Sequence, residues 1–254
     1  MSSWGCHLRK VIIVVPCYNE QKRLDAARFR EFQDKLRNVR FLFVNDGSTD
    51  NTGEVLEALR ASNPEAFDVC ALPRNMGKAE AVRQGLLKAF ALRPDYVGFW
   101  DADLATPLEA IPELCSVLNE QPQIEMVFGS RVRLLGRRIE RRALRHYLGR
   151  MFATLASLVL GLTVYDTQCG AKVFRASDGS RDLFRDPFLT RWIFDVEIIA
   201  RAIKARRGTS LPQVEEIICE VPLRQWRDVG GSKITACDGM RAAVELLRIR
   251  RQYL

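Results

Sequence analysis

Histidine and closely spaced cysteines are scarce in this sequence. Its 254 residues include only two histidines, His7 and His146, and none of the seven cysteines forms a Cys-x-x-Cys pair. Zinc sites and disulfide frameworks usually require such groupings. The sequence therefore argues against both, and we interpret the cysteines as reduced thiols packed in the fold.

Long apolar runs are also lacking. No stretch approaches the roughly 18 to 20 apolar residues that a membrane-spanning helix needs, and residues 1–10 lack the pattern of a signal peptide. Hydrophobic residues make up 47% of the chain and charged residues 28%, as in ordinary globular proteins. We therefore expect a cytoplasmic protein with one large core or two modest ones.

Acidic residues are outnumbered by basic ones. Lysine and arginine total 39 against 31 aspartates and glutamates, which gives a net charge of +8. Most of the excess follows residue 130, in "RVRLLGRRIERRALRHYLGR" (131–150) ahead of the apolar "MFATLASLVLGLTVY", and in the amphipathic "GMRAAVELLRIRRQYL" (239–254). This pattern fits either a solvated helix face beside a core helix or basic helices on an anionic membrane surface. The arginines alternate with leucine, isoleucine and alanine rather than with stacking aromatics, so we expect no nucleic-acid partner.

Short apolar runs alternate with helical patterns through the first half of the chain. Runs suited to strands fall at residues 11–15, 41–44, 69–72, 96–100 and 126–128. Helical patterns fall at residues 20–37, 51–62, 77–91 and 107–119, with Asp50 and Thr106 as expected caps and Pro107 in a first turn. The alternation is typical of an α/β protein whose mostly parallel, Rossmann-like sheet is flanked by helices.

Polar motifs follow the first four predicted strands. They are "PCYNE" (16–20), "NDGSTDNT" (45–52), "RNMGKAEAVRQG" (74–85) and "DADLATP" (101–107). Each alone is compatible with an ordinary turn. Because the carboxyl ends of parallel strands share one edge of a sheet, we expect the four motifs to converge on a ligand.

Asp101 and Asp103 stand one residue apart at the end of the fourth predicted strand. Two carboxylates so close repel each other unless a cation lies beside them. Mg²⁺ and Mn²⁺ prefer oxygen ligands and commonly bind phosphate oxygens as well. The pair therefore predicts a divalent metal site that bridges the protein to a nucleotide diphosphate.

In this order, "VVPCYNE", "FVNDGSTDNT", "NMGKAEAVRQG" and "DADLATP" resemble the inverting family-2 glycosyltransferases of the GT-A fold, which use sugar nucleotides. "FGSR", "DTQCGAKVF", "RWIFDVEI" and "WRDVGGSKI" resemble the dolichyl-phosphate glucosyltransferase and mannosyltransferase branch, nearer the glucosyl side. The resemblance covers about residues 10–250. It implies one GT-A domain over residues 1–254, with a nucleotide-sugar half at about 10–130 and an acceptor and membrane half at about 131–254.

The resemblance also implies donor-site roles where residues match the family's motifs. Base and ribose contacts fall on Pro16, Tyr18, Glu20 and Asp46. Asp101 falls on a ribose or metal contact and Asp103 on the principal metal ligand. Lys78 would add charge near the nucleotide, although a plain helix-start lysine fits equally well. Arg227 and Lys233 match a segment that closes on the diphosphate across the intervening glycines.

On the acceptor side, Arg131 and Arg145 match arginines that bind the phosphate of a polyprenyl-phosphate lipid. A phosphate monoester already carries roughly −1.5 to −2 charges near pH 7, so its oxygen needs no strong base. Asp166 and Asp195 remain candidate catalytic carboxylates, beside Asp103, that would orient the acceptor or the sugar hydroxyls; a loop or helix-cap role fits them equally well.

Two positions depart from the family pattern. Some mannosyl members place a further metal ligand where this chain has Ala105, which favours the glucosyl branch, and Ala79 replaces a usual glycine. The expected reaction is metal-dependent, inverting transfer of a hexose, with UDP-glucose as donor and dolichyl or polyprenyl phosphate as acceptor. GDP-mannose as donor and a hydroxyl acceptor stay open as alternatives. A nucleotidyltransferase would need a glycine-rich loop where "PCYNE" stands.

Overall fold

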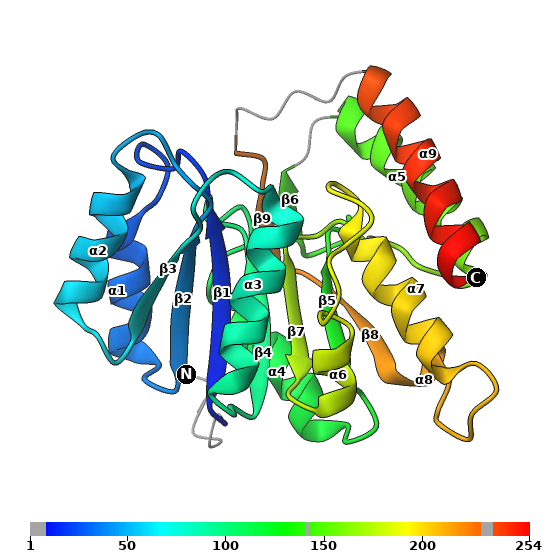
Figure 1. The fold of residues 1–254 in the computed structure, drawn as a ribbon, viewed down its shortest axis with the longest axis horizontal. Coiled ribbons are helices and arrows are strands. Elements are labelled where there is room, and N and C mark those ends of the chain that lie inside the picture. The colour runs from blue at the N-terminus through cyan, green and yellow to red at the C-terminus, as the bar shows by residue number, and fades with distance from the viewer. Residues whose placement is uncertain (1–8, 141–142, 230–235) are drawn as a thin grey trace.

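The computed structural model describes residues 9–140, 143–229 and 236–254, of which 143–146 and 236–240 are described by their backbone alone. Its centre is a seven-stranded sheet in the order β3-β2-β1-β4-β7-β5-β8 (Figure 1). The strands are β1 (Val11–Cys17), β2 (Val39–Asn45), β3 (Phe67–Ala71), β4 (Tyr96–Trp100), β5 (Met126–Ser130), β7 (Ala171–Arg175) and β8 (Ile218–Pro222). The first four are parallel, whereas β7 runs antiparallel between β4 and β5.

Strands β1, β4 and β5 are buried on both faces of the sheet because they are apolar at nearly every position. In β1, Val11, Ile13 and Val15 join one core, while Ile12 and Val14 join the other. Successive side chains of a strand point to opposite faces, so a continuous apolar run suits a sheet covered on both sides. The predicted α/β fold is thereby confirmed, including the fifth strand at residues 126–130.

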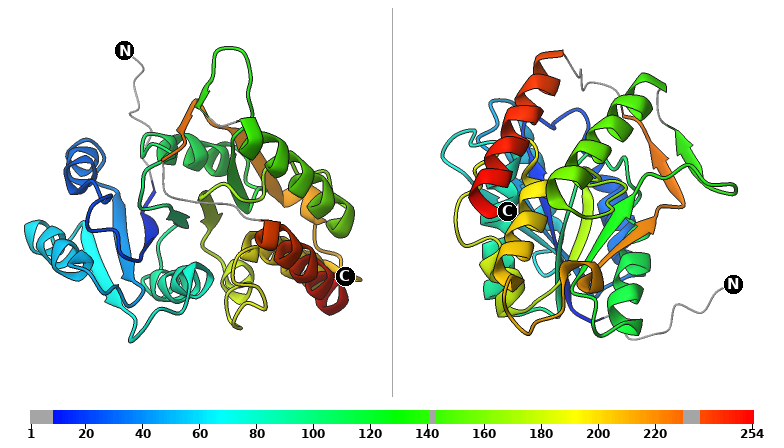
Figure 2. Two further views of the ribbon diagram at one scale, coloured as in Figure 1. Left: turned by 90° about the horizontal axis from the view of Figure 1, so that it is seen from above. Right: turned by 90° about the vertical axis from the view of Figure 1, so that its right-hand side faces the viewer.

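Helices cover both faces (Figures 1 and 2). The first core contains side chains of α1 (Ala26–Lys35), α2 (Thr52–Ser62) and α4 (Ala110–Glu120). The second core contains side chains of α3 (Lys78–Ala91), α5 (Ala143–Leu160), α7 (Phe194–Arg206), α8 (Val214–Ile217) and α9 (Ala236–Tyr253), with α6 (Asp178–Asp182) at its edge. Of the five described cysteines, all are free thiols, and three are buried.

Two predicted helix starts and one further predicted cap are wrong. The helix expected from residue 20 begins at Ala26, because the Glu20 carbonyl accepts the Arg23 and Leu24 amides in a turn and Asp25 caps the helix. The helix expected from residue 107 begins at Ala110, so Thr106 does not cap it and Pro107 lies before its first turn. Asn51 rather than Asp50 occupies the cap position of α2, while the Asp50 carboxylate accepts the Thr52 amide.

The arginine-rich segment 131–150 is not one helix. Arg138–Glu140 forms β6, which pairs in parallel with β9 (Gln225–Arg227), and only the later part of the segment joins α5. The expectation of a second basic amphipathic helix agrees with α9, which packs beside α5 and α7 (Figure 2). Within the described ranges, the helices are too short or too polar to cross a bilayer.

Candidate active site

Asp101 begins the loop that leaves the buried strand β4. Its amide donates to the Gly170 carbonyl at 3.0 Å. Gly170 precedes β7, and a Cβ atom at this position would collide with the Asp101 carboxylate. Glycine is therefore required where β7 passes beneath the acid, because any side chain there would displace it. The sequence-based prediction did not include Gly170, although "QCG" directly before an apolar strand is the signal that identifies it.

Lys78 is the first residue of α3, and its Nζ lies 2.5 Å from Asp101 Oδ1. Partial burial acts to lower the pKa of Lys78, but the carboxylates of Asp101, Asp195 and Asp103 outweigh it, and the pKa is raised. The ammonium therefore stays charged and offsets one of the two adjacent acids. Lys78, which was predicted to add positive charge near the nucleotide, is thus paired with Asp101 in this structure.

Asp103 lies two residues further along the same loop. Its Oδ1 accepts the Ala105 amide at 3.0 Å, and the intervening Leu104 adopts a left-handed conformation with φ 50°. Such a backbone costs on the order of 1–3 kcal/mol for a residue other than glycine and is concentrated at functional sites. Burial, and then the neighbouring Asp101, raise the pKa of Asp103.

The loop after β1 approaches Asp103 from the other side. Glu20 is buried and forms a two-bonded ion pair with Arg23, at 2.5 and 2.8 Å. Burial raises the pKa of Glu20, Arg23 opposes the shift, and Asp103 and Asp101 add to it. Tyr18, by contrast, is 43% exposed, and Pro16 is half-buried at the strand end. Glu20 thus belongs to the same acidic group as the aspartates.

Asp46, after β2, is buried and accepts the amides of Met76 and Gly77 at 2.7 and 2.9 Å. It therefore fixes the loop that leads into Lys78. Gly47 has φ 64°, and a Cβ there would collide with the Arg74–Asn75 backbone, so these two loops are in direct contact. The predicted convergence of the four strand ends is observed.

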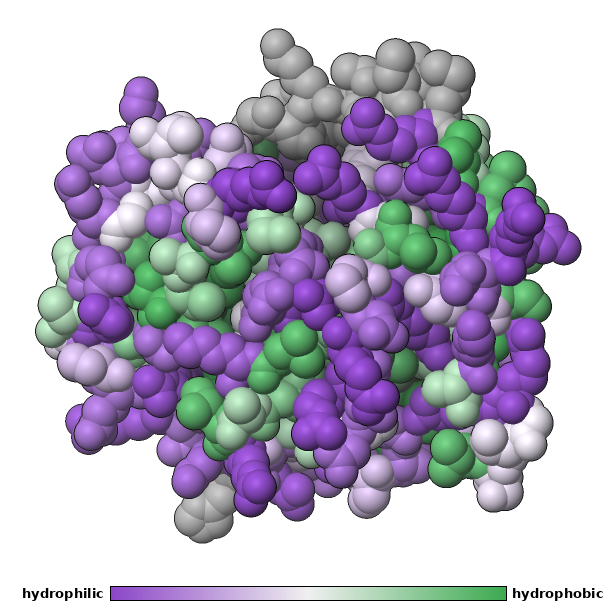
Figure 3. Space-filling model, viewed as in Figure 1, coloured by the Kyte–Doolittle hydropathy of each residue, from purple (hydrophilic) through white to green (hydrophobic). Residues whose placement is uncertain are grey.

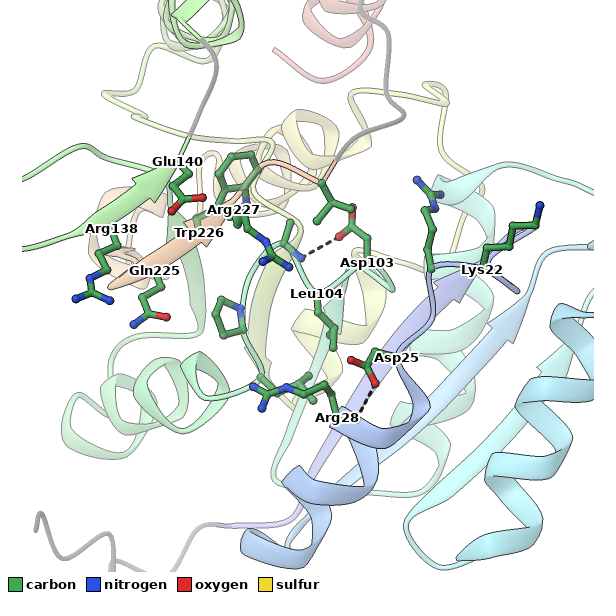
Figure 4. Close-up of a pocket in the computed structure, with 15 residues that line it drawn as sticks. Lys22, Asp25, Arg28, Asp103, Leu104, Arg138, Glu140, Gln225, Trp226 and Arg227 are labelled. Atoms are coloured by element: carbon green, nitrogen blue, oxygen red, sulfur yellow. Dashed lines mark hydrogen bonds between the residues drawn. The ribbon is translucent and has the colours of Figure 1, made fainter.

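A cleft of about 700 Å³ opens beside Asp103, between the start of α1 and β9 (Figure 4). Arg227 lines it from β9, and its amide donates to the Ala105 carbonyl at 3.0 Å, so this strand is attached to the Asp103 loop. The other cations in the lining are Lys22, Arg23, Arg28 and Arg138. These cations outnumber the acids of the lining, Asp25, Asp103 and Glu140, so the cleft suits an anionic ligand.

Arg131 and Asp166, predicted separately, form one ion pair. Arg131 Nε and Nη2 each lie 2.7 Å from a carboxylate oxygen of Asp166, and the Arg131 amide also donates to it. The guanidinium lies 5.4 Å from the centre of the Trp226 ring. Burial acts against the charge on Arg131, but Asp166 outweighs it and raises the arginine pKa. A small cavity beside the pair is lined by Arg150 and Phe152 of α5.

Asp195, in the first turn of α7, forms the other buried pair. Its Oδ1 lies 2.6 Å from Nζ of Lys172, a residue of β7 that the sequence-based prediction did not include. A lysine inside the apolar run "AKVF" was the signal for it. Two predicted sites lie outside the described part of the chain, namely Lys233 and the side chain of Arg145.

The residues at the edge of the sheet fit a divalent cation. Asp101 and Asp103 provide hard oxygen donors, and a cation would offset both the burial of the Asp103 carboxylate and its repulsion by Asp101, which together raise the pKa of Asp103. Within residues 9–140, 143–229 and 236–254, no three acidic, histidine or cysteine side chains form a metal cluster. The two aspartates would therefore hold a metal together with ligand oxygens or water.

Solved structures share this architecture and define its class. Glucosyl-3-phosphoglycerate synthase from Mycobacterium tuberculosis, crystallised with UDP, superposes with a TM-score of 0.62 at 19% identity, covering 96% of this chain and 80% of that one. Its complex with Mn²⁺, UDP-glucose and phosphoglyceric acid gives 0.63 at 20% identity, with the same coverage. The fold is therefore GT-A.

The sequence comparisons then give the family. The model described as "Glycosyl transferase family 2" matches residues 12–180. The dolichyl-phosphate beta-glucosyltransferase of Saccharomyces cerevisiae is 32% identical over 95% of this chain and 74% of its own length. The human enzyme of that name is 31% identical over 100% of this chain and 78% of its own length. One from Trichomonas vaginalis is 32% identical over 93% of this chain and 69% of its own length. This chain belongs to glycosyl transferase family 2.

Proposed function

We propose that this glycosyltransferase transfers glucose, with inversion, from UDP-glucose to dolichyl or polyprenyl phosphate in a metal-dependent reaction. The observation that carries the proposal is the match to dolichyl-phosphate beta-glucosyltransferases along almost the whole chain. The Asp101–Asp103 loop supports a sugar-nucleotide donor, because it combines paired acids with a cation-lined cleft. The single sheet built by strands from both halves supports one domain over residues 1–254.

For the donor, we assign Asp101 and Asp103 to Mg²⁺ or Mn²⁺. A bound divalent cation would offset the charge of the leaving diphosphate. The loops that carry Pro16, Tyr18, Glu20 and Asp46 would hold base and ribose, since they meet at the same edge of the sheet. Lys78 and Arg227 flank the aspartates and would contact the phosphates, and Lys233 is assigned to the same role from the sequence alone.

For the acceptor, we assign the lipid phosphate to Arg131, and Arg145 is added from the sequence alone. Asp166 holds the Arg131 guanidinium in a fixed plane, so it acts on the acceptor through the arginine. Asp195 would orient the acceptor or the sugar hydroxyls. The anionic acceptor oxygen attacks the anomeric carbon as the bond to the diphosphate breaks, and no proton has to be removed.

The outer faces of α5 and α9 support a peripheral position on a membrane. On α5, Tyr147, Met151 and Leu158 are more than half exposed, and on α9 Val244 and Leu247 are exposed beside arginines. An apolar patch is visible at this side of the molecule, among charged residues (Figure 3). We call the exposed apolar side chains of α5 and α9 the apolar patch. Basic helices with exposed apolar residues bind anionic lipid surfaces, here on the cytosolic side.

A donor and acceptor matrix tests the proposal. The purified protein is incubated with Mg²⁺ or Mn²⁺ and either UDP-glucose or GDP-mannose, with and without dolichyl phosphate in detergent. Nucleotide release and lipid-linked sugar are both measured. UDP release that depends on the lipid and yields a glucosylated lipid is the expected result. If only GDP-mannose gives lipid-dependent release of nucleotide, the donor is GDP-mannose and not UDP-glucose. Turnover that does not depend on the lipid would contradict dolichyl phosphate as the acceptor.

A further inference from the structure

Lys172 lies at the centre of the sheet with no exposed surface. Lysine is among the residues least often buried completely. Its register partners are Phe99 on β4 and Phe128 on β5, and its Nζ lies 5.3 and 5.1 Å from their ring centres. Aromatic faces favour a cation but do not replace the water that an ammonium loses on burial.

Two polar partners lie beside the ammonium. Nζ lies 2.6 Å from Asp195 Oδ1 and donates to the Cys169 carbonyl, also at 2.6 Å. Asp195 belongs to the first turn of α7, whereas Cys169 immediately precedes Gly170. The Gly170 backbone lies beneath the Asp101 carboxylate, and the Gly170 carbonyl accepts a hydrogen bond from the Asp101 amide. The Lys172 ammonium therefore connects the Asp101 side of the site with the Asp195 side.

Stability alone does not account for this lysine. A buried ion pair replaced as a whole by apolar or neutral side chains of similar volume is often as stable or more stable. A role that would explain the lysine is geometric, because its ion pair with Asp195 connects β7 to α7. Methionine at position 172 would fill the same space without either contact.

We propose that Lys172 is a positioning residue, which holds the Cys169–Gly170 turn beneath Asp101 and so sets the geometry of the nucleotide site. The inference rests on the donor half of the proposed function, and it goes beyond it by assigning a role to a residue that contacts no substrate. A different role would be simple neutralisation of Asp195. The two roles predict different behaviour when both charges are removed.

A double-mutant cycle separates them, with Lys172→Met, Asp195→Asn and the double variant. The melting temperature is measured for each protein without ligand. Binding of UDP in the presence of Mn²⁺ is measured by calorimetry well below each melting temperature, with GDP in parallel. UDP lacks the sugar, so it reports on the Asp101 side of the site, which Asp195 reaches only through its charge effect on Lys78.

We expect Lys172→Met to lower the melting temperature, because Asp195 is left buried without its partner, and the double variant to regain most of that loss. Nucleotide affinity should fall about tenfold in both variants that lack Lys172 and stay within about twofold in Asp195→Asn. Recovery of affinity together with stability in the double variant would overturn the proposal.

The partly exposed pair Lys88–Asp68, at 3.2 Å, whose aspartate also pairs with Arg40 at 3.9 Å, provides the matched control. Lys88→Met with Asp68→Asn should change neither UDP affinity nor transfer. If the wild-type protein binds UDP but does not glucosylate dolichyl phosphate, the proposed acceptor is wrong and the inference about Lys172 is unaffected. Absence of both UDP and GDP binding by the wild-type protein would overturn the donor site and this inference together.

Discussion

Gly170 lies directly beneath Asp101, accepting its amide at 3.0 Å and leaving no room for a β-carbon against the carboxylate. The two residues are distant in sequence and meet because β4 and β7 are neighbours in the sheet. Asp101 is thus positioned by the second half of the chain. A change that adds one methyl group at position 170 tests this relationship directly.

Gly170→Ala should lower transfer on the order of 100-fold, because a shift of about 1 Å in a catalytic group can cost that much. The effect should appear as weaker Mn²⁺-dependent UDP binding, measured by calorimetry. Gly179→Ala in α6 is the control, since a Cβ there meets only the Ser177 hydroxyl at 3.9 Å. Equal activity of both variants would contradict the close contact at Asp101.

Asp103→Asn should abolish transfer and leave the fold intact. Because burial and Asp101 raise the pKa of Asp103, removal of its charge relieves repulsion, and the melting temperature without ligand should stay equal or rise. Asp178→Asn, a substitution at an exposed position, is the control for both measurements. Full transfer by Asp103→Asn would refute the assigned metal role.

Acid should inactivate the enzyme at a higher pH than an ordinary aspartate would allow. The pKa of Asp103 is raised in the folded state, so the folded protein binds its proton more tightly than the unfolded chain. This group's contribution to stability is therefore largest at low pH and falls as the pH rises above about 4 through its folded pKa. Its ionised form binds metal, so activity should change in the opposite direction, rising through the same range.

Metal concentration gives the check on that pH dependence. A divalent cation competes with the proton for Asp103, so a higher Mn²⁺ concentration should move the acid limb of the activity profile to lower pH. The profile is measured at two Mn²⁺ concentrations with UDP-glucose at saturation. If the pH of the acid limb does not change with Mn²⁺ concentration, the group that titrates is not Asp103.

Arg131→Ala should raise the acceptor concentration needed for half-saturation about tenfold or more, with that for UDP-glucose unchanged. The variant also leaves Asp166 without its partner, so the free energy of unfolding should fall by about 3–5 kcal/mol. Assays therefore belong well below its melting temperature. Arg60→Ala, in an exposed pair on α2, is the control. Unchanged acceptor saturation would remove Arg131 from the acceptor site.

Leu158→Asp and Leu247→Asp should weaken binding to anionic vesicles at least tenfold, because each places a charge in the apolar patch. Sedimentation with vesicles that contain phosphatidylserine measures this, and UDP binding should not change. Leu211→Asp, at a leucine that is 52% exposed in the loop before α8, is the control. Vesicle binding that survives both substitutions would exclude this surface.

The sequence permits prediction of the parallel first half, because each strand is a short apolar run and each motif follows directly. Asp101, Asp103 and Asp46 could be named for the same reason. Gly170 and Lys172 could not, since their importance comes from an antiparallel strand inserted between β4 and β5, and strand order is not local information. The pairing of Arg131 with Asp166 is likewise a tertiary contact between residues 35 positions apart.

The start of α1 illustrates a different limit. Residues 20–25 carry the same helical periodicity as the helix itself, but Thr52 accepts the Glu20 amide, and this contact with the start of α2 holds the segment in a turn. Similarly, Arg138–Glu140 resembles a basic helix until Gln225–Arg227 pairs with it. In both places a partner from another part of the chain outweighs local preference.

The place of β7 also bears on how the protein is made. During synthesis, β1 to β4 can assemble as soon as they emerge, but the strand between β4 and β5 comes only after another seventy or so residues of chain have been added. Until then the sheet has an open edge at β4, and Asp101 has nothing beneath it. A nascent or truncated chain that ends before Gly170 should therefore expose a strand edge prone to aggregation and bind no nucleotide, so that the donor site matures late, as a product of sheet closure.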